Sequence, residues 1–322
     1  MTVIHPRTVA EAQAYSGEYR AGGTDVEARR RIGLTQPVTI DLRHLPGMAG
    51  IDVRSDGSTR IGAMVKIREV AGLRAYPALA ATAASLANPH TRAVATVGGN
   101  LLQQTRCWYY RTGEVECHKT GHDGCLARAG IHHFGNLFDT SSCVAPHPSS
   151  LAMALVAYDA TVEVHPGGAR PIEELYDAVD PRTEHRLTAG EVLVAVNLPP
   201  AGSGERAAYG RATGRALGEW PEVEVACSLT LQGSGEIGRI RVVAGAVGPV
   251  PLRLRGVEAA LAGHLPTAET ISEAARHAGD GARPAPQAAG KLRLLVGLVA
   301  DVVERAVAGD DRTEFAFHEQ PR

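Results

Sequence analysis

The stretch of sequence that decides the fold spans residues 94–143 and reads VATVGGNLLQQTRCWYYRTGEVECHKTGHDGCLARAGIHHFGNLFDTSSC. It opens with the pair Gly98-Gly99, and four of the chain's five cysteines follow between residues 107 and 143. Glycine lets successive backbone N–H groups converge on one anion without side-chain obstruction. Clustered thiolates are typical ligands of redox-active metal centres. The stretch therefore predicts a redox protein that holds a phosphate-bearing cofactor beside a thiolate-rich loop.

The spacing of these cysteines, C-x9-C-x7-C-x17-C, bears on which metal centre they could ligate. Structural zinc sites usually contain C-x2-C pairs, because a tight knuckle brings two sulfurs to one metal, and the loop has no such pair. Four thiolates on one irregular loop suit a [4Fe–4S] cluster, in which each iron takes one cysteine. Zinc, disulfides in an exported protein, unligated thiols and ligation by the loop histidines His118, His132 and His133 stay open as alternatives. The predicted ligands are Cys107, Cys117, Cys125 and Cys143.

A second glycine turn lies about 75 residues earlier, in the sequence AGGTD at residues 21–25. Thr24 adds a hydroxyl donor, and the helix-like stretch VEARRRIGL that follows would present its N-terminus to the same anion. Two such turns would clasp one pyrophosphate from two sides, while a plain tight turn before a helix is the alternative for each. Neither turn has the G-x-G-x-x-G spacing of a dinucleotide-binding fold. The residues predicted to contact the cofactor here are Ala21, Gly22, Gly23, Thr24, Asp25, Val26, Thr96, Val97, Gly98, Gly99 and Asn100.

The composition of the 322 residues argues against several classes of partner. The net charge of −2 and the pI near 6.7 provide no attraction for nucleic acid or an anionic membrane, and aromatic residues make up only 4%. No apolar run reaches the length of about 18 residues that a membrane-spanning helix needs. The N-terminal stretch MTVIHPRTVAEAQAY does not resemble a signal peptide, and an odd number of cysteines, mostly in one loop, does not suit a disulfide framework. We therefore expect the cytoplasm, while export of the folded chain with a signal-bearing partner stays open.

The rest of the sequence alternates short strand and helix patterns. A helical segment is predicted over residues 66–88, and Pro148-Ser149-Ser150 is an N-cap signal for the helix LAMALVAYDA. A second domain is predicted to start near Thr188 with the strand LVAVNLP. The final helix, KLRLLVGLVADVVERAVA, has apolar residues at helical spacing, which favours packing against a core.

Several of these motifs resemble those of one known family. AGGTD at residues 21–25 and ATVGGNL at residues 95–101 are similar to the two pyrophosphate-binding signatures of the FAD-binding subunit of molybdenum hydroxylases, the xanthine dehydrogenase and carbon monoxide dehydrogenase family. VTIDLRHL, AYDATVEV and GAVGPVPLRLR, which begin at residues 38, 157 and 245, resemble further parts of the family pattern. The resemblance covers nearly the whole chain.

This resemblance implies an α+β fold built from two domains. The first would be a two-subdomain FAD-binding domain of the PCMH type, similar to vanillyl-alcohol oxidase, and the second an α+β domain of the carbon monoxide dehydrogenase flavoprotein C-terminal type. The implied boundaries are 1–180 for the FAD-binding domain, with subdomains of about 1–57 and 58–180 and an iron–sulfur loop at 104–146, then 187–290 for the C-terminal domain and 291–322 for a helix and tail.

An inserted four-cysteine loop at this place resembles the flavoprotein subunits of 4-hydroxybenzoyl-CoA reductase and, more closely, of bacterial periplasmic aldehyde oxidoreductase. The resemblance implies an oxidoreductase subunit that binds FAD and a [4Fe–4S] cluster and contributes no catalytic residue to oxidation of the organic substrate. Its partners would be a large subunit with a molybdenum cofactor and a small subunit with [2Fe–2S] clusters, in a heterotrimer whose further dimerisation stays open. Electrons would pass from these partner centres to the FAD and then to an external acceptor.

Two positions depart from the family pattern. Arg211 is a candidate flavin contact where related chains more often carry lysine, and a guanidinium keeps the charge but not the shape of an amine. Ser150 stands where the family usually has an aspartate. The competing functional hypotheses are a stand-alone flavin oxidase of the vanillyl-alcohol type and a zinc-stapled scaffold without redox function.

Overall fold

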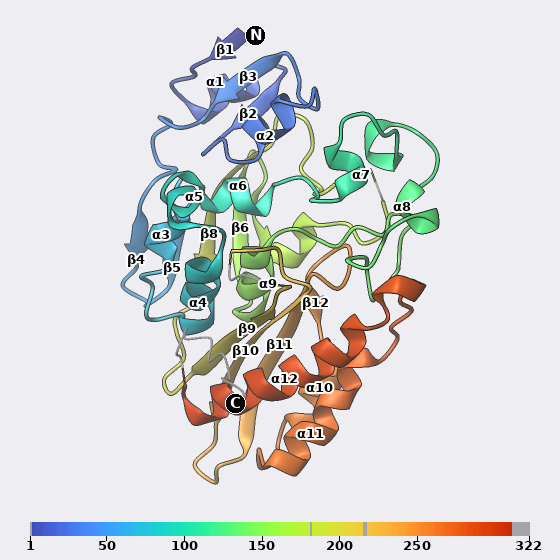
Figure 1. Cartoon of the computed structure of the whole chain (residues 1–322). Coiled ribbons are helices and arrows are strands. Elements are labelled where there is room, and N and C mark those ends of the chain that lie inside the picture. Colours follow the sequence, from blue (N-terminus) through green and yellow to red (C-terminus); the bar gives the residue numbers. More distant parts are fainter. Residues whose placement is uncertain (1, 181, 215–217, 311–322) are drawn as a thin grey trace.

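The computed structural model describes residues 2–180, 182–214 and 218–310. These residues form three β-sheets covered by helices, so the predicted mixed α+β class is confirmed. Figure 1 shows the sheet of the N-terminal strands at one end of the molecule and the last helices at the other. The predicted tail after the final helix, residues 311–322, lies outside the described residues.

The N-terminal sheet is parallel and has the strand order β1-β3-β2. Its central strand is the most buried, with Ile40 fully enclosed, because it has a neighbour on each side. β2 ends at Arg20, so the first glycine segment begins where this strand leaves the sheet. The elements of this part are β1 (Thr2–Ile4), α1 (Val9–Gln13), β2 (Glu18–Arg20), α2 (Val26–Arg30) and β3 (Val38–Asp41).

The middle sheet is antiparallel and has the order β4-β5-β8-β6-β7. The strand at residues 192–198, which the sequence places at the start of the second domain, instead lies in this sheet between β5 and β6. Its apolar run VLVAV is buried at every position, and a central place in a covered sheet satisfies such a run. The strands are β4 (Ile51–Val53), β5 (Thr59–Gly62), β6 (Thr161–His165), β7 (Gly168–Pro171) and β8 (Val192–Leu198).

Short helices connect and cover this sheet. The helical segment predicted over residues 66–88 is divided into α3 and α4, because Pro77 occupies the first turn of a new helix. The predicted cap of α9 is confirmed, since the Ser149 hydroxyl accepts a hydrogen bond from the Ala152 N–H at 3.1 Å. The helices are α3 (Ile67–Val70), α4 (Pro77–Ser85), α5 (Pro89–Val94), α6 (Val97–Leu101), α9 (Ser150–Ala157) and η2 (Ile172–Leu175).

The third sheet, with the order β12-β11-β10-β9, is antiparallel and is covered on both faces. Alternate residues of a strand point to opposite faces, so Val225 and Cys227 of β10 join the core beneath α12, while Ala226 joins the core that contains α4 and α9. The strands are β9 (Arg206–Ala212), β10 (Val223–Leu231), β11 (Ile237–Gly245) and β12 (Leu252–Arg253).

The helices of this last part include the predicted final helix, α12. Its apolar stripe is buried, with Leu295, Val299 and Val303 fully enclosed, which confirms the core-packing interpretation. None of the helices in the described part of the chain combines the length and the apolar composition that a membrane crossing requires. The helices are α10 (Arg255–Leu261), α11 (Ala268–Arg276), η3 (His277–Gly279), η4 (Pro286–Ala288) and α12 (Lys291–Ala308).

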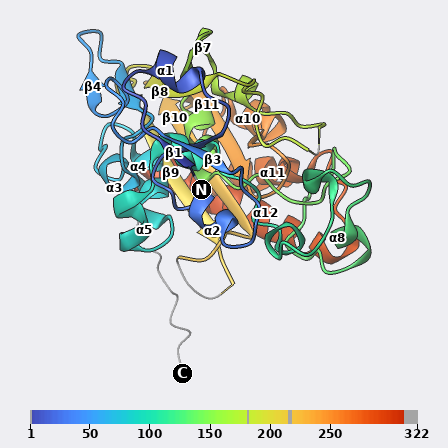
Figure 2. The same cartoon turned by 90° about the horizontal axis from the view of Figure 1, so that it is seen from above.

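The cysteine loop, residues 104–146, contains only short helical turns and lies at one side of the molecule in both views (Figures 1 and 2). Its end is fixed to α12, because the Lys291 ammonium donates hydrogen bonds to the carbonyl oxygens of Gly135 at 2.9 Å and Ala246 at 2.7 Å. Lys291 is only 3% exposed, and this burial lowers its pKa to about 8. The turns are α7 (Trp108–Arg111), η1 (His118–Thr120) and α8 (Leu126–Ala129).

Candidate functional site

The two glycine segments, far apart in the sequence, lie side by side in the structure. A Cβ atom placed on Gly22 would lie 2.2 Å from the carbonyl oxygen of Val94, just before the second segment. A Cβ atom on Gly99 would lie 3.7 Å from the Cβ of Ala21 in the first segment. The approach at Gly22 leaves no room for a side chain, so the glycine there is needed for contact between the segments.

The two segments differ in the hydrogen bonds that their backbone amides make. In the second segment, the amide of Val97 donates to Val65 O at 3.0 Å, that of Gly98 to Ala63 O at 2.8 Å and that of Gly99 to the Thr96 hydroxyl at 3.1 Å. This segment is therefore the capped start of α6 and not the open turn that the sequence suggests. In the first segment, the amides of residues 22–25 donate to no acceptor within the described part of the chain. The donors that remain for an anion thus belong to the first segment.

A cleft with about 840 Å³ of empty space, including the part open to solvent, begins at these segments. Of the predicted cofactor contacts, Thr24, Asp25, Gly99, Asn100 and Arg211 line it, whereas Ala21, Gly22, Gly23, Val26, Thr96, Val97 and Gly98 are not among its lining residues. Lining residues that the sequence analysis did not assign include Arg92, Gln103, Arg106 and Trp220.

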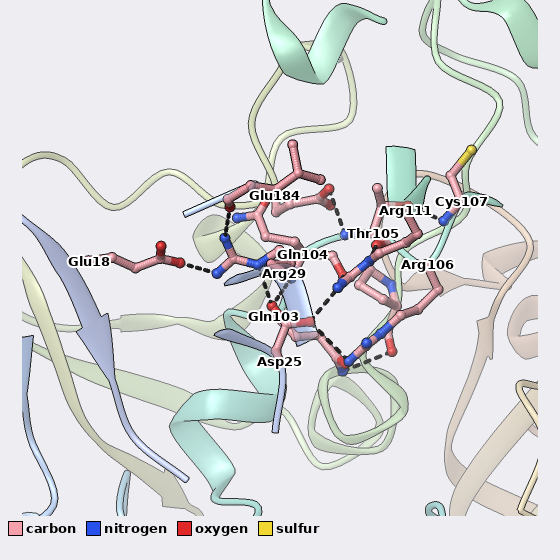
Figure 3. Close-up of polar contacts among 12 residues, drawn as sticks. Glu18, Asp25, Arg29, Gln103, Gln104, Thr105, Arg106, Cys107, Arg111 and Glu184 are labelled. Carbon is pink, nitrogen blue, oxygen red and sulfur yellow. Dashed lines mark hydrogen bonds and ion pairs between the residues drawn. The ribbon is translucent and has the colours of Figure 1, made fainter. Parts of the chain in front are cut away.

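Asp25 lines the cleft, but its carboxylate is engaged by three arginines (Figure 3). Its oxygens lie 2.9 Å from Arg29 Nε, 3.1 Å from Arg106 Nη2 and 2.7 Å from Arg111 Nη2. Burial alone would raise the pKa of Asp25, but the charges of Arg106 and Arg111 and the hydrogen bonds from Arg111 and Arg29 lower it overall. Since Arg106 and Arg111 belong to the cysteine loop, Asp25 ties that loop to the first glycine segment.

Arg106 and Arg211 bring positive charge to the cleft wall. The Arg106 guanidinium lies 4.7 Å from the centre of the Trp220 ring, and burial lowers the pKa of Arg106 to about 10. Arg211 donates to the carbonyl oxygen of Ser85 at 2.7 Å and to that of Glu219. The Nε atoms of both arginines are buried and have no hydrogen-bond partner within the described residues. Two orphaned cationic donors fit an anionic, acceptor-rich ligand.

The four loop cysteines meet at one place. All four line a single hollow together with Tyr109, His118, Lys119 and Leu126, among others. Burial raises the pKa of Cys107, and the negative charges of the Cys125 and Cys117 thiolates raise it further. A hydrogen bond with Cys143 lowers the pKa of Cys125, so this sulfur is the more readily ionised of the pair. Within the described residues, no group of three or more His, Cys, Asp or Glu side chains is arranged to hold a single metal ion.

The hollow and the cleft are joined by one short piece of backbone. Arg106 lines the cleft, and the next residue, Cys107, lines the hollow. Glu184, which is not part of the cysteine loop, holds the backbone next to Arg106 in place. Its carboxylate accepts a hydrogen bond from the Thr105 amide at 3.0 Å and forms an ion pair with Lys119 at 2.8 Å. A cradle for an anionic ligand and a convergent set of thiols are therefore immediate neighbours.

This site and this fold define a class of protein. Residues 1–201 match the family described as FAD binding domain in molybdopterin dehydrogenase, and residues 208–307 match the family described as CO dehydrogenase flavoprotein C-terminal domain. The chain belongs to the family of FAD-binding subunits of molybdenum hydroxylases.

Individual relatives agree with this assignment. The aldehyde oxidoreductase FAD-binding subunit PaoB of Escherichia coli (strain K12) is 34% identical over 257 residues, which cover 76% of this chain and 79% of the relative. The carbon monoxide dehydrogenase medium chain of Hydrogenophaga pseudoflava is 26% identical over 316 residues, 94% of each chain.

Solved structures show the same fold. The chain superposes on carbon monoxide dehydrogenase from Hydrogenophaga pseudoflava with a TM-score of 0.74 and 23% identity, covering 96% of this chain and 97% of the other. For quinoline 2-oxidoreductase from Pseudomonas putida 86 the TM-score is 0.75 at 20% identity, with 97% and 98% coverage.

Proposed function

We propose that this chain is the electron-transfer subunit of a molybdenum-dependent aldehyde oxidoreductase or xanthine dehydrogenase-type enzyme, and that it carries FAD in the cleft and a [4Fe–4S] cluster in the thiol hollow. The observation that carries the proposal is the adjacency of the two sites, since Arg106 belongs to one and Cys107 to the other. A protein that only bound a nucleotide would not need four converging thiols one residue away.

The cleft fits FAD through its donors. The free amides of residues 22–25 and the Thr24 side chain would hold the pyrophosphate, and Gly99 and Asn100 would form the facing wall. Arg106 and Arg211 would supply positive charge to the acceptor-rich parts of the ligand. The bound FAD would accept electrons singly or in pairs, and the protein's part is to position it and tune its potential.

The hollow fits a cluster through its sulfurs. Cys107, Cys117, Cys125 and Cys143 come from separate parts of an irregular loop, and each would give one thiolate to one iron. The nearby Lys119 ammonium stabilises negative charge at Cys143 and would do the same for a thiolate-ligated cluster.

The partners are inferred from the relatives. The similar chains are named as FAD-binding subunits or medium chains of larger enzymes. We therefore expect a large subunit with the molybdenum cofactor, where the organic substrate would be oxidised, and a small subunit with [2Fe–2S] clusters that delivers electrons to the FAD. An external acceptor would remove them.

The domain division is also part of the proposal. We place the FAD-binding domain at residues 1–180, the C-terminal domain at 187–290 and the final helix and tail from 291, with β8 of the second range completing the middle sheet of the first. Two hydrophobic cores support a two-domain chain, although the core that contains α9 also takes in Tyr209, Ala226 and Val243 from the third sheet. The sheet is thus shared between the two cores.

The test is anaerobic purification of the chain with its co-expressed neighbours, followed by flavin, iron, sulfide, zinc and molybdenum analysis. We expect one FAD and about four irons per chain, as a [4Fe–4S] cluster requires, together with two co-purifying subunits. One zinc without flavin would overturn the proposal in favour of a scaffold. Oxidation of small alcohols or aldehydes by the isolated chain would overturn it in favour of a stand-alone flavin oxidase.

A further inference from the structure

A buried carboxyl group lies directly behind the wall of the cleft. Glu224 of β10 is only 2% exposed, and its strand neighbour across β9 is Arg211, which lines the cleft. By the alternation of a strand, Glu224 shares its face with Ala226, so it points toward α9 and not toward α12. Ser150, the first residue of α9, lies between this carboxyl and the cleft and lines the cleft.

Hydrogen bonds connect Glu224 to the cleft on one side and close it off on the others. The Tyr209 hydroxyl donates to Glu224 Oε2 at 2.9 Å, and the Ser150 side chain, which lies beside the carboxyl, lowers the pKa of Glu224 through a hydrogen bond to it. On the far side, a Cβ atom placed on Gly245 would lie 2.6 Å from Glu224 Oε1, so the backbone of β11 packs closely against the carboxyl. Of the three residues Ser150, Tyr209 and Gly245 that contact the carboxyl, Ser150 is the one that lines the cleft.

The charges around Glu224 do not form a direct ion pair with it. The groups that face it are Tyr209 and Arg211 of β9 and Ser150 of α9. Arg211 directs its hydrogen bonds to the carbonyl oxygens of Ser85 and Glu219, and among the described residues no cation forms an ion pair with the Glu224 carboxyl. Burial raises the pKa of Glu224, and the charge of Arg211 offsets only part of this effect. A buried carboxyl without a direct counter-ion holds its proton more strongly than an exposed one.

We infer that Glu224 is the proton donor and acceptor of the flavin cleft and that it exchanges its proton through the Ser150 hydroxyl. The inference rests on the proposed function. Two-electron reduction of a flavin consumes at least one proton, and the electrons come from the partner centres. The Glu224 O–H bond breaks as its proton passes to Ser150 Oγ, and the Ser150 O–H bond breaks as its own proton passes into the cleft. The carboxylate that remains lies near the positive charge of Arg211, and reoxidation by the acceptor returns the proton along the same route.

Glu224→Gln and Ser150→Ala, each in the assembled complex, test this route. Reduction of the bound flavin by dithionite is followed by anaerobic stopped flow in H2O and D2O. We expect both variants to be slower by at least about tenfold, because a positioned acid or base contributes roughly 10²–10⁴-fold. We expect the double variant to be no slower than either single variant, since both remove the same route.

A second readout does not depend on rate. The infrared difference spectrum between the oxidised and reduced complex should show a protonated carboxyl signal that changes on flavin reduction and is missing in Glu224→Gln. Glu258→Gln is the matched control, because Glu258 is also a buried glutamate but is paired with Arg253 at 2.5 Å away from the cleft lining. It should keep the wild-type signal and rate.

The outcomes of these experiments distinguish the proposed function from the proton route through Glu224 and Ser150. If the wild-type complex contains no flavin, the proposed function and this inference both fall. If the flavin is bound but Glu224→Gln keeps the wild-type rate, isotope effect and carboxyl signal, only the inference is overturned. If Glu224→Gln does not fold, Ser150→Ala decides, and wild-type behaviour in that variant overturns the route.

Discussion

Replacing Asp25 with asparagine should separate the cysteine loop from the first glycine segment. The Asp25 side chain is 12% exposed and forms ion pairs with Arg29, Arg106 and Arg111 at 2.7–3.1 Å. Removing one partner of a buried ion pair costs about 3–5 kcal/mol. The arginines here are partly solvated and asparagine keeps one acceptor oxygen, so we expect a smaller cost than this, about 2–3 kcal/mol. This corresponds to a fall in Tm of roughly 5–10 °C.

The pH dependence follows from the direction of the Asp25 pKa shift. Because the folded-state pKa is lowered, the stabilisation is complete above the unfolded-state pKa of about 3.9 and is lost only as the pH falls below it. The difference in Tm between wild type and Asp25→Asn should therefore be the same at pH 5.5 and pH 8. It should also survive in 0.5 M salt, because buried pairs are screened much less than exposed ones.

Differential scanning calorimetry at the two pH values and the two salt concentrations provides the measurement. Asp301→Asn is the control, because Asp301 is 57% exposed and its pair with Arg305, at 3.4 Å, spans one turn of α12. Such an exposed pair contributes about 0.3–0.5 kcal/mol, so that Tm should barely move. Equal Tm values for Asp25→Asn and wild type, or a difference that vanishes in salt, would refute the buried-hub reasoning.

Three further outcomes are expected. Cys117→Ser should lower the iron content measured on the anaerobically purified complex, whereas Cys227→Ala should not, because Cys227 is buried in β10 away from the thiol hollow. Arg106→Ala should weaken FAD binding by about tenfold in a fluorescence titration, which is ~1.4 kcal/mol for one charged contact, and the exposed Arg74→Ala should leave it unchanged. Lys291→Met should remove a rise in Tm between pH 8 and pH 10, because the pKa of Lys291 is lowered to about 8 in the folded state, so the wild type gains stability as the pH rises from about 8 toward the unfolded-state pKa of about 10.4. Wild-type iron content in Cys117→Ser, wild-type FAD affinity in Arg106→Ala, or a wild-type rise in Tm between pH 8 and pH 10 in Lys291→Met would contradict the respective prediction.

Local signals in the sequence were sufficient for part of the site. The Gly22 and Gly98-Gly99 segments could be located because close backbone approach needs glycine, and the structure shows such approaches at Gly22 and Gly98. The four cysteines could be grouped because their spacing keeps them on one loop. The amphipathic pattern of α12 was likewise a local property, and its buried stripe matches it.

Other features depend on contacts that no local pattern reports. The run at residues 192–198 reads as a buried strand, but its partners β5 and β6 lie more than 25 residues away in the sequence. The hydrogen bonds that occupy the amides of Val97 and Gly98 come from residues 63 and 65, on the other side of α3, α4 and α5. The arginines that surround Asp25 are 4, 81 and 86 residues away, so the local motif predicted a cofactor contact at Asp25 but gave no sign that its carboxylate is also an ionic hub.

The succession of Arg106 and Cys107 has a consequence for how the two sites act on each other. Adjacent Cα atoms are fixed about 3.8 Å apart, so a shift of the Cys107 sulfur on gaining or losing a metal ligand must be absorbed within a few residues. Toward the cleft, the available residues are held by Asp25, Gln103 and Glu184. Arg106 is therefore the first cleft residue that such a shift would meet, and its Nε has no hydrogen-bond partner within the described residues. If FAD occupies the cleft as proposed, removing a thiol ligand should therefore weaken FAD binding, although no cysteine is among the residues that line the cleft in the described part of the chain.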